Sequence, residues 1–476
     1  MSLYMYLLVP AVCALTVLFL GRYRPRLAGP ITCAVLGAGL LSALFQLPVY
    51  RAIVLFAGRL NVSPVSVTAS ETLSFLMILS VYLTGFAAVF FACYDEPPTT
   101  RRRFYFALVL GVVAAMSGAA ASEDLLALFV FTETVSLLTC LLASLDDTPR
   151  SAGAALKTYS FSIVGAAAAG AGSALAAYCA GGTSFSQLAA VGGGSLGMRI
   201  AAALVLCGYA VKAGIMPFHG DLPELYSTAR GARSAVLACA GIRTAGIYAV
   251  LKIMLVLPAF VYAPAARALM LFGVFSLIAA AFLAFTKQDL KHLLTYAGIS
   301  QAGYVLIAAG LGTPLAIAGA VFQLVSETAA ETVLYLNSSI LERQTGVHDI
   351  ADMGGLRRRM PWTAGTTLVS ALSMAGLPPL AGFWGQFVII FSLWKTDHPL
   401  FAAGAAFGVL LTFVYTLSSY RKIFHGRVPI PLDNVTEPAG GFLVPTVLLS
   451  LLLVLAGLCF PYIFTQLLEP GAKVFI

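Results

Sequence analysis

Long apolar runs, separated by short polar stretches, fill almost the whole chain. Each run holds about 20 mostly apolar residues, the length that an α-helix needs to cross the hydrocarbon core of a bilayer. The pattern predicts an all-α integral membrane protein, in which residues 1–476 form a single membrane domain of about fourteen transmembrane helices. In chain order the runs cover residues 3–21, 29–49, 72–94, 104–121, 124–144, 155–180, 199–218, 234–257, 266–286, 290–311, 314–341, 362–394, 400–420 and 442–467.

Two of these runs contain residues that interrupt a helix. The run 362–394 is longer than one crossing requires, and its centre reads AGLPPLAGFWGQF. The run 199–218 has a milder interruption. Proline lacks an amide donor and clashes with the preceding turn, so we expect both helices to be discontinuous, a packing kink being the alternative. Paired interruptions in the two halves of a transporter indicate inverted repeats with a site between them. The expected breaks lie at Pro217, Gly376, Pro378 and Pro379.

Composition and charge agree with a membrane protein. Hydrophobic residues make up 60% of the chain and charged residues 10%, whereas a soluble domain carries about 25% charged residues. Of the 28 lysines and arginines, nineteen fall in loops after odd-numbered helices, six on the other side and three within helices. This bias predicts a multi-pass protein of a prokaryotic cell (inner) membrane with cytoplasmic odd-numbered loops and both termini outside. The net charge of +8 is then an orientation signal, and nucleic-acid binding is not expected.

The chain offers no sign of a catalytic centre of its own. Its eight cysteines are scattered through the apolar runs, and no pair has the spacing of metal ligands or of a disulfide framework. A nucleotide-binding loop and a catalytic triad are also missing from the sequence. We therefore expect no metal site, no cofactor and no catalytic residue here, and we expect any redox centre to lie on a partner subunit.

Five ionisable residues within the apolar runs are candidates for a functional site. A charged side chain at the bilayer centre costs about 2.5–3.5 kcal/mol on insertion scales, so such groups pair with one another or line water. A neighbouring carboxylate favours the charged form of a buried lysine, so a lysine whose glutamate partner moves can take up and release a proton. Structural ion pairs are the alternative interpretation. The five residues are Glu133, Lys212, Arg243, Glu327 and Glu331, of which the last two share one helical face.

Four stretches together resemble a known family. In chain order they read FVFTETVSLLTCLLAS, VKAGIMPFHGDLPELY, TKQDLKHLLTYAGISQAGYVLIAAGLG and DMGGLRRRMPWTAGTTLVSALSMAGLPPLAGFWGQF. They are similar to motifs of the antiporter-like, proton-conducting membrane subunits. Those subunits occur in respiratory complex I, in energy-converting hydrogenases and formate hydrogenlyases, and in multi-subunit cation/proton antiporters. The resemblance covers about residues 70–430.

The resemblance implies two inverted five-helix repeats, helices 4–8 and 9–13, in which helices 7 and 12 are discontinuous. It also implies a polar axis at mid-membrane along which protons pass. On that axis the fifth-helix Glu133 pairs with the seventh-helix Lys212, and Arg243 falls where the eighth helix usually carries a lysine. The chain then divides into residues 1–103 (helices 1–3), 104–257 (first repeat), 266–427 (second repeat) and 442–467 (helix 14).

The sequence departs from the family pattern mainly in the second repeat. The eleventh helix usually carries histidine and lysine where this chain has Glu327 and Glu331. The bend in helix 12 is usually followed by lysine or glutamate, and here it is followed by Gln386. An amide cannot change its charge, although it can hydrogen-bond to a chain of water. Either the proton path runs through the two glutamates, or this copy conducts poorly.

These features predict a proton- or Na⁺-translocating membrane subunit of a redox-driven complex I-like or hydrogenase-type complex. The expected partners are other antiporter-like subunits and the quinone- or hydrogenase-module subunits, all within the lipid bilayer. Two alternatives stay open: a non-conducting scaffold copy in such a complex, and a secondary transporter or antiporter subunit that works with another partner. The residues expected to take part in translocation are Glu133, Lys212, Arg243, His292, Glu327, Glu331 and Gln386.

Overall fold

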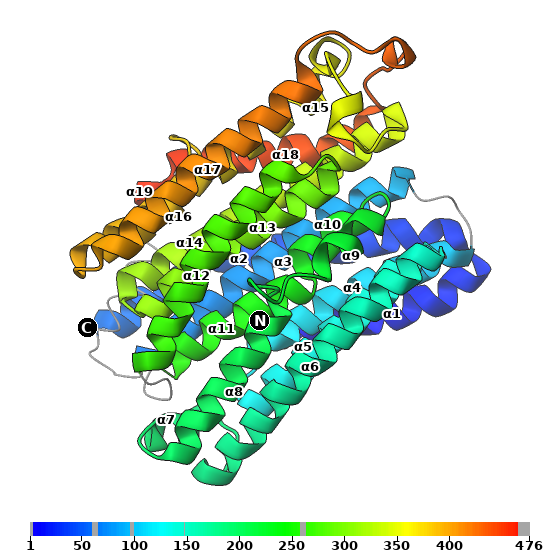
Figure 1. Cartoon of the computed structure of the whole chain (residues 1–476). Coiled ribbons are helices and arrows are strands. Elements are labelled where there is room, and N and C mark those ends of the chain that lie inside the picture. The colour runs from blue at the N-terminus through cyan, green and yellow to red at the C-terminus, as the bar shows by residue number, and fades with distance from the viewer. Residues whose placement is uncertain (1–2, 60–64, 96–99, 147, 258–262, 465–476) are drawn as a thin grey trace.

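The computed structural model describes residues 3–59, 65–95, 100–146, 148–257 and 263–464 as long helices joined by short turns (Figure 1). Within these residues, pairing of extended backbone is limited to two isolated β-bridges, so the all-α prediction is confirmed. Twelve helical segments of the described chain are long and apolar enough to cross a membrane. The first six are α1 (Met5–Tyr23), α2 (Pro25–Arg59), α3 (Val65–Asp95), α4 (Thr100–Ala121), α5 (Leu125–Ser144) and α6 (Pro149–Ala180). The others are α10 with α11 (Arg233–Ala240, Ile242–Val256), α12 (Ala263–Thr286), α13 (Leu290–Leu311), α14 (Pro314–Thr345), α17 (Pro399–Phe424) and α18 (Gly440–Leu458).

The remaining two apolar runs are each interrupted, and a pair of shorter helices forms at each. The run 362–394 contains both of its helices, whereas the run 199–218 contains only the first, and the second begins at Leu222 beyond the end of the run. None of these four helices reaches the length of a full crossing, and the two runs are those in which the sequence predicted interruptions. The pairs are α8 (Leu196–Lys212) with α9 (Leu222–Thr228), and α15 (Pro361–Met374) with α16 (Ala381–Lys395). Short connecting helices are α7 (Phe185–Val191), η1 (Ile350–Asp352), η2 (Leu356–Arg358), η3 (Ile430–Leu432) and α19 (Phe460–Ile463).

Both interruptions begin with an Ala-Gly dipeptide just after the first helix ends. Gly214 has φ of 61° and Gly376 has φ of 70°, a backbone region that favours glycine. Backbone groups released by the breaks find side-chain partners, because membrane-depth backbone must be satisfied within the protein. The amide of Met216, for example, donates to Ser276 Oγ of α12 at 2.9 Å. A cis peptide bond precedes a proline in each break, at Met216–Pro217 and Pro378–Pro379.

Further local features occur at matching places in the two predicted repeats. An aspartate caps the N-terminus of α5 and of α13, and each also forms one of the two β-bridges. A glycine with positive φ ends α6 and α14. Such pairs are what an internal repeat of 104–257 and 266–427 would produce. The paired residues are Asp124 and Asp289, Gly181 and Gly346, and the bridge partners Ser184 and Asp349.

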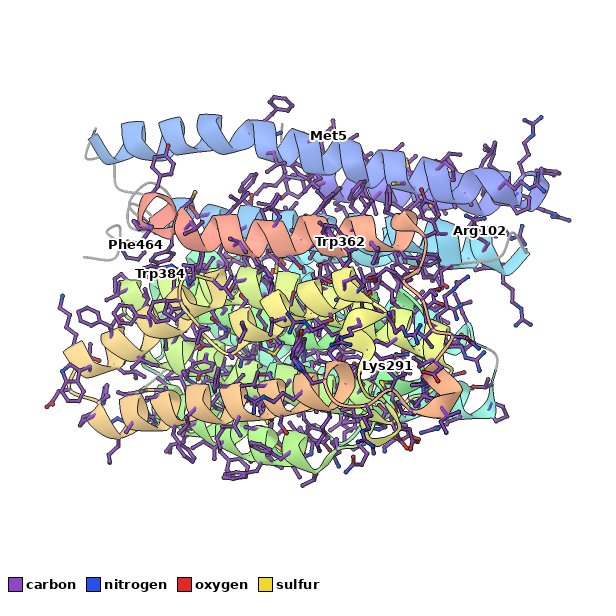
Figure 2. The ribbon with its side chains drawn as sticks, turned by 90° about the horizontal axis from the view of Figure 1, so that it is seen from above. Met5, Arg102, Lys291, Trp362, Trp384 and Phe464 are labelled. Carbon is purple, nitrogen blue, oxygen red and sulfur yellow. The ribbon has the colours of Figure 1, made fainter. Side chains whose placement is uncertain are left out.

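The helices α11, α13 and α14 form the centre of the bundle. Nearly all of their residues are buried, whereas α1 and α2 (blue) and α17 (orange) lie at opposite sides of the bundle (Figure 2). The run 234–257 is not one continuous helix, because it divides at Gly241 between α10 and α11. A Cβ atom on Gly241 would lie 2.2 Å from Leu237 O, so only glycine fits this turn. The central helices carry most of the buried polar groups described next.

Candidate functional site

Lys212 lies at the C-terminal end of α8 with its side chain fully buried. Its Nζ is 2.7 Å from Glu133 Oε1 on α5. It also donates to Ser136 Oγ at 3.0 Å and to Ser162 Oγ at 3.3 Å. The negative end of the α8 dipole faces this amine and adds to its stabilisation. The buried ammonium group is therefore stabilised by polar partners from two helices, Glu133 and Ser136 of α5 and Ser162 of α6.

The two members of this ion pair differ in exposure. The Lys212 side chain is fully enclosed, whereas 28% of the Glu133 side chain is exposed at the flank of α5. Glu133 and Lys212, which the family resemblance paired, are therefore in contact in the structure.

A second charged cluster joins α11 to α14. Arg243 Nη1 lies 3.4 Å from Glu327 Oε1, and Arg243 Nη2 makes a short contact with Glu331 Oε2. Nη2 also donates to Ala238 O at 3.3 Å, a carbonyl released by the break at Gly241. All three charged side chains are buried. One guanidinium faces two carboxylates, so three ionised groups would leave one buried negative charge uncompensated.

The charged cluster has sites at which a proton can bind. Glu327 Oε2 and Glu331 Oε1 are buried and have no hydrogen-bond partner in the described chain. Gly298 of α13 makes room for Glu331 and Arg243, because a Cβ atom there would lie 2.1 Å from Glu331 Oε1 and 2.2 Å from Arg243 Nη1. A proton shared between the carboxylates would remove the excess negative charge and supply the missing donor.

The helices that carry the two charged clusters touch where α11 crosses the end of α8. A Cβ atom on Gly246 would lie 2.4 Å from Ala213 N and 2.8 Å from the carbonyl carbon of Lys212. Gly246 follows Arg243 by less than one helical turn. The backbone that ends at Lys212 is therefore in van der Waals contact with the helix that carries Arg243.

Gln386 belongs to a network of neutral amides rather than to a charged pair. Its Nε2 donates to Gln301 Oε1 at 3.1 Å and to Met374 O at 2.9 Å. Gln323 Nε2 donates to the same Gln301 oxygen at 3.1 Å, and Gln301 in turn donates to Thr412. The sequence analysis missed Gln301 and Gln323, although Gln323 lies one turn before Glu327 and on the same helical face.

Two further residues occupy places that the sequence did not foresee. His292 lies in the first turn of α13, where its Nδ1 is 3.2 Å from Asp289 Oδ1 and its side chain is one-quarter exposed. Lys252 of α11 is buried and donates to Ala120 O at 2.6 Å and to Ala119 O at 3.3 Å. His292 thus lies at a helix end rather than in the charged cluster, and Lys252 caps the C-terminus of α4.

A family model described as NADH:quinone oxidoreductase/Mrp antiporter, TM, matches residues 122–412, the stretch that holds both charged clusters and the amide network. The chain belongs to this family. The resemblance seen in the four sequence motifs is therefore confirmed, and the chain is an antiporter-like membrane subunit of the type that the family description names.

Two relatives show how far the likeness extends. Over 456 residues the chain is 27% identical to a Na(+)/H(+) antiporter subunit of Alkalihalophilus pseudofirmus, and the match covers 93% of this chain and 90% of the relative. Over 251 residues it is 32% identical to the NADH-quinone oxidoreductase subunit M of Escherichia coli K12, and the match covers 52% of this chain and 49% of the relative.

Solved structures share the fold across nearly the whole chain. A chain of the Mrp complex from Dietzia sp. DQ12-45-1b matches with a TM-score of 0.87 and 21% identity, over 99% of this chain and 97% of the other. A chain of respiratory complex I from Thermus thermophilus matches with a TM-score of 0.83 and 24% identity, over 99% of both chains. The fold is therefore that of the membrane subunits in these assemblies.

Proposed function

We propose that this chain translocates protons as one membrane subunit of a larger complex. The observation that carries the proposal is the enclosed Lys212 amine, held between a carboxylate at the bundle flank and two serine hydroxyls. An amine in that position loses much of its electrostatic stabilisation whenever Glu133 moves away. Movement of one side chain can therefore control whether Lys212 holds its proton.

The proposed transfer runs from the first charged cluster to the second. When the Glu133 carboxylate withdraws, the Lys212 ammonium releases a proton toward the helix contact between Ala213 and Gly246. A carboxylate beside Arg243 accepts it, because the cluster has one negative charge more than its guanidinium balances. The N–H bond on Lys212 is replaced by an O–H bond on Glu327 or Glu331, and the neutral amine takes a new proton from water when Glu133 returns.

The driving force is proposed to come from neighbouring subunits. The similar proteins are named as subunits of a Na(+)/H(+) antiporter and of an NADH-quinone oxidoreductase, and the similar structures are of multi-subunit complexes. We accordingly assign other membrane subunits as partners, a redox-driven assembly as the setting, and a bacterial or archaeal cell membrane as the location. The bias of basic residues supports a cytoplasmic position for the odd-numbered loops.

A non-conducting scaffold is the second candidate, and the amide network favours it. Gln386 fills the position where the family pattern has a titratable group, and neither Gln386 nor its partners Gln301 and Gln323 can carry a proton by changing charge. The third candidate is cation/proton antiport, which is favoured by the antiporter relative that aligns over 93% of this chain.

Two substitutions separate these functions. Lys212→Ala and Glu331→Gln are introduced into the intact complex, and proton uptake is measured in inverted membrane vesicles while assembly is checked by purification. A conducting subunit loses coupled proton transport in both variants while the complex still assembles. Full pumping in both variants would establish the scaffold. Proton transport that depends on added Na⁺ and not on the redox substrate would establish cation/proton antiport. Lys157→Ala is the control, since Lys157 pairs with Glu224 on the exposed surface.

A further inference from the structure

A buried ion pair outside the two charged clusters lies between the start of α13 and the end of α14. Lys291 is 4% exposed, and its Nζ lies 2.5 Å from Glu342 Oε2 and donates to Ala229 O at 2.8 Å. Figure 2 labels Lys291 among the packed helices. This lysine is the sequence neighbour of His292, but it turns inward toward α14 whereas His292 pairs with Asp289.

The same glutamate connects this pair to the surface. Glu342 Oε1 lies 3.2 Å from Nδ1 of His348, and the His348 side chain is 58% exposed. The three titratable groups are therefore arranged in order of depth, from His348 through Glu342 to the enclosed amine of Lys291. By the distribution of basic residues, this end of the bundle is the cytoplasmic one.

Buried hydroxyl groups continue the line toward the Arg243 cluster. Thr295, one turn after Lys291, donates to the Lys291 carbonyl at 2.8 Å, and its Oγ1 lies 3.2 Å from Tyr335 OH. Tyr335 is one turn after Glu331 on the same face of α14. Hydroxyl groups both donate and accept hydrogen bonds, so they can pass a proton without holding a charge.

A second tyrosine lines the same stretch. Tyr226 of α9 packs edge-on against Tyr335, with ring centroids 6.2 Å apart, and its buried hydroxyl has no hydrogen-bond partner in the described chain. Tyr226 is one turn before Ala229, whose carbonyl accepts from Lys291. Both tyrosines lie within electrostatic range of Arg243 and Glu331. The stretch between Lys291 and Glu331 is therefore lined by polar groups.

We propose that His348, Glu342 and Lys291 form a proton inlet that feeds the Arg243–Glu331 pair. The proposal rests on the proposed function, since it supplies a proton to the same charged cluster. A proton from water binds His348, passes to the Glu342 carboxylate and then to the Lys291 amine. Lys291 releases it through water and the hydroxyls of Thr295 and Tyr335 to Glu331. Each step breaks one O–H or N–H bond and forms another.

The alternative is a structural clamp in which the ion pair only holds α9, α13 and α14 together. Lys291→Arg separates the two, because arginine keeps the positive charge and the ion pair but does not release a proton in proteins. Glu342→Gln keeps a hydrogen-bonding side chain but cannot titrate, and Glu342→Asp keeps a titratable carboxylate. If the ion pair is only a clamp, Lys291→Arg leaves proton uptake unchanged. If it is an inlet, the same substitution lowers proton uptake.

The experiment measures proton uptake per assembled complex in inverted membrane vesicles, with the redox reaction followed in parallel. We expect Lys291→Arg and Glu342→Gln to slow proton uptake by about a hundredfold, the lower end of the range for loss of a positioned proton-transfer group. Glu342→Asp is expected to retain most of the rate. The matched controls are Lys157→Arg and Glu224→Gln, which alter an exposed pair of 3.1 Å.

Lys212→Ala, measured in the same experiment, distinguishes failure of the inlet from failure of the proposed function. Normal uptake in Lys291→Arg together with blocked uptake in Lys212→Ala would overturn the inlet and leave the proposed function standing. Normal uptake in Lys212→Ala as well would overturn the proposed function, and the inlet with it. Equal loss in Glu342→Asp and Glu342→Gln, at normal assembly, would also count against the inlet, because a carboxylate would then not be sufficient.

Discussion

Gly246 of α11 lies against Ala213, the residue that follows Lys212, so closely that a Cβ atom would be 2.4 Å from the Ala213 amide nitrogen. This contact holds the lysine-bearing end of α8 beside the helix that carries Arg243. The distance between the two charged clusters therefore depends on the absence of a single side chain.

Gly246→Val is expected to destabilise the protein and to lower proton transport. Overpacking a filled site costs about 1–3 kcal/mol, and here the strain separates α8 from α11. Thermal unfolding of the purified complex measures the first effect and vesicle proton uptake the second. Gly365→Val is the matched control, since a Cβ atom on Gly365 of α15 would meet nothing within 4 Å. Equal loss in both variants would show that the close contact has no special importance.

Arg243→Met is expected to prevent stable assembly, whereas Arg243→Met with Glu331→Gln is expected to recover part of it. Removing one partner of a buried ion pair leaves an uncompensated charge, which costs about 3–5 kcal/mol. The second substitution removes one of the two stranded carboxylates. The yield and thermal unfolding of the complex compare the variants. If the double variant is no more stable than the single one, excess negative charge is not what destabilises the cluster.

Gln386→Leu is expected to lower stability because it removes the side-chain donor to Met374 O, whereas Gln301 Oε1 keeps its bond from Gln323. An acceptor left without its hydrogen bond costs about 1–3 kcal/mol. Thermal unfolding of the complex measures this change. Phe387→Leu, at a neighbouring exposed position on α16, is the control and is expected to change stability little. A Gln386→Leu protein as stable as the parent would mean that water replaces the amide.

Asp289→Ala is expected to destabilise the start of α13 at neutral pH by about 0.5–2 kcal/mol, the usual range for an N-cap. Burial alone would raise the pKa of Asp289, but hydrogen bonds from the side chain and backbone of His292 outweigh it and hold the pKa below its ordinary value. A lowered pKa stabilises the fold above the ordinary aspartate range, and this contribution disappears as the pH falls through the lowered value.

Unfolding measured from neutral to acidic pH checks this dependence. The difference in stability between the parent and Asp289→Ala is expected to shrink as the pH falls. Asp289→Asn is the control, because asparagine caps a helix about as well as aspartate but carries no titratable charge. A difference that stays constant with pH would assign the whole effect to the capping hydrogen bond from the His292 amide.

The sequence predicted the structure well where the residues allowed only one backbone conformation. Long apolar runs have to form helices in lipid, and Ala-Gly followed by proline has to end one, so most crossings and both interruptions could be predicted. The approach of Lys212 to Glu133 came from the family resemblance, since nothing in the spacing of two residues so far apart indicates a contact.

The remaining features of the fold and the site depend on how the helices rotate and pack, which the sequence alone does not determine. A lone glycine in an apolar run is usually tolerated, so the division at Gly241 gave no signal. Lys291 and His292 are adjacent at the start of a helix, and only the rotation of α13 decides which of them turns inward. Gln301 and Gln323 are ordinary polar residues until three helices bring them to Gln386.

Gly298 also bears on whether the charged cluster could be moved into another protein. A Cβ atom at this position would press against the ends of the Glu331 and Arg243 side chains, so both would have to shift. Introducing the arginine and the glutamate into a relative with a larger residue on this helix is therefore expected to reproduce the present geometry only if the glycine is introduced as well.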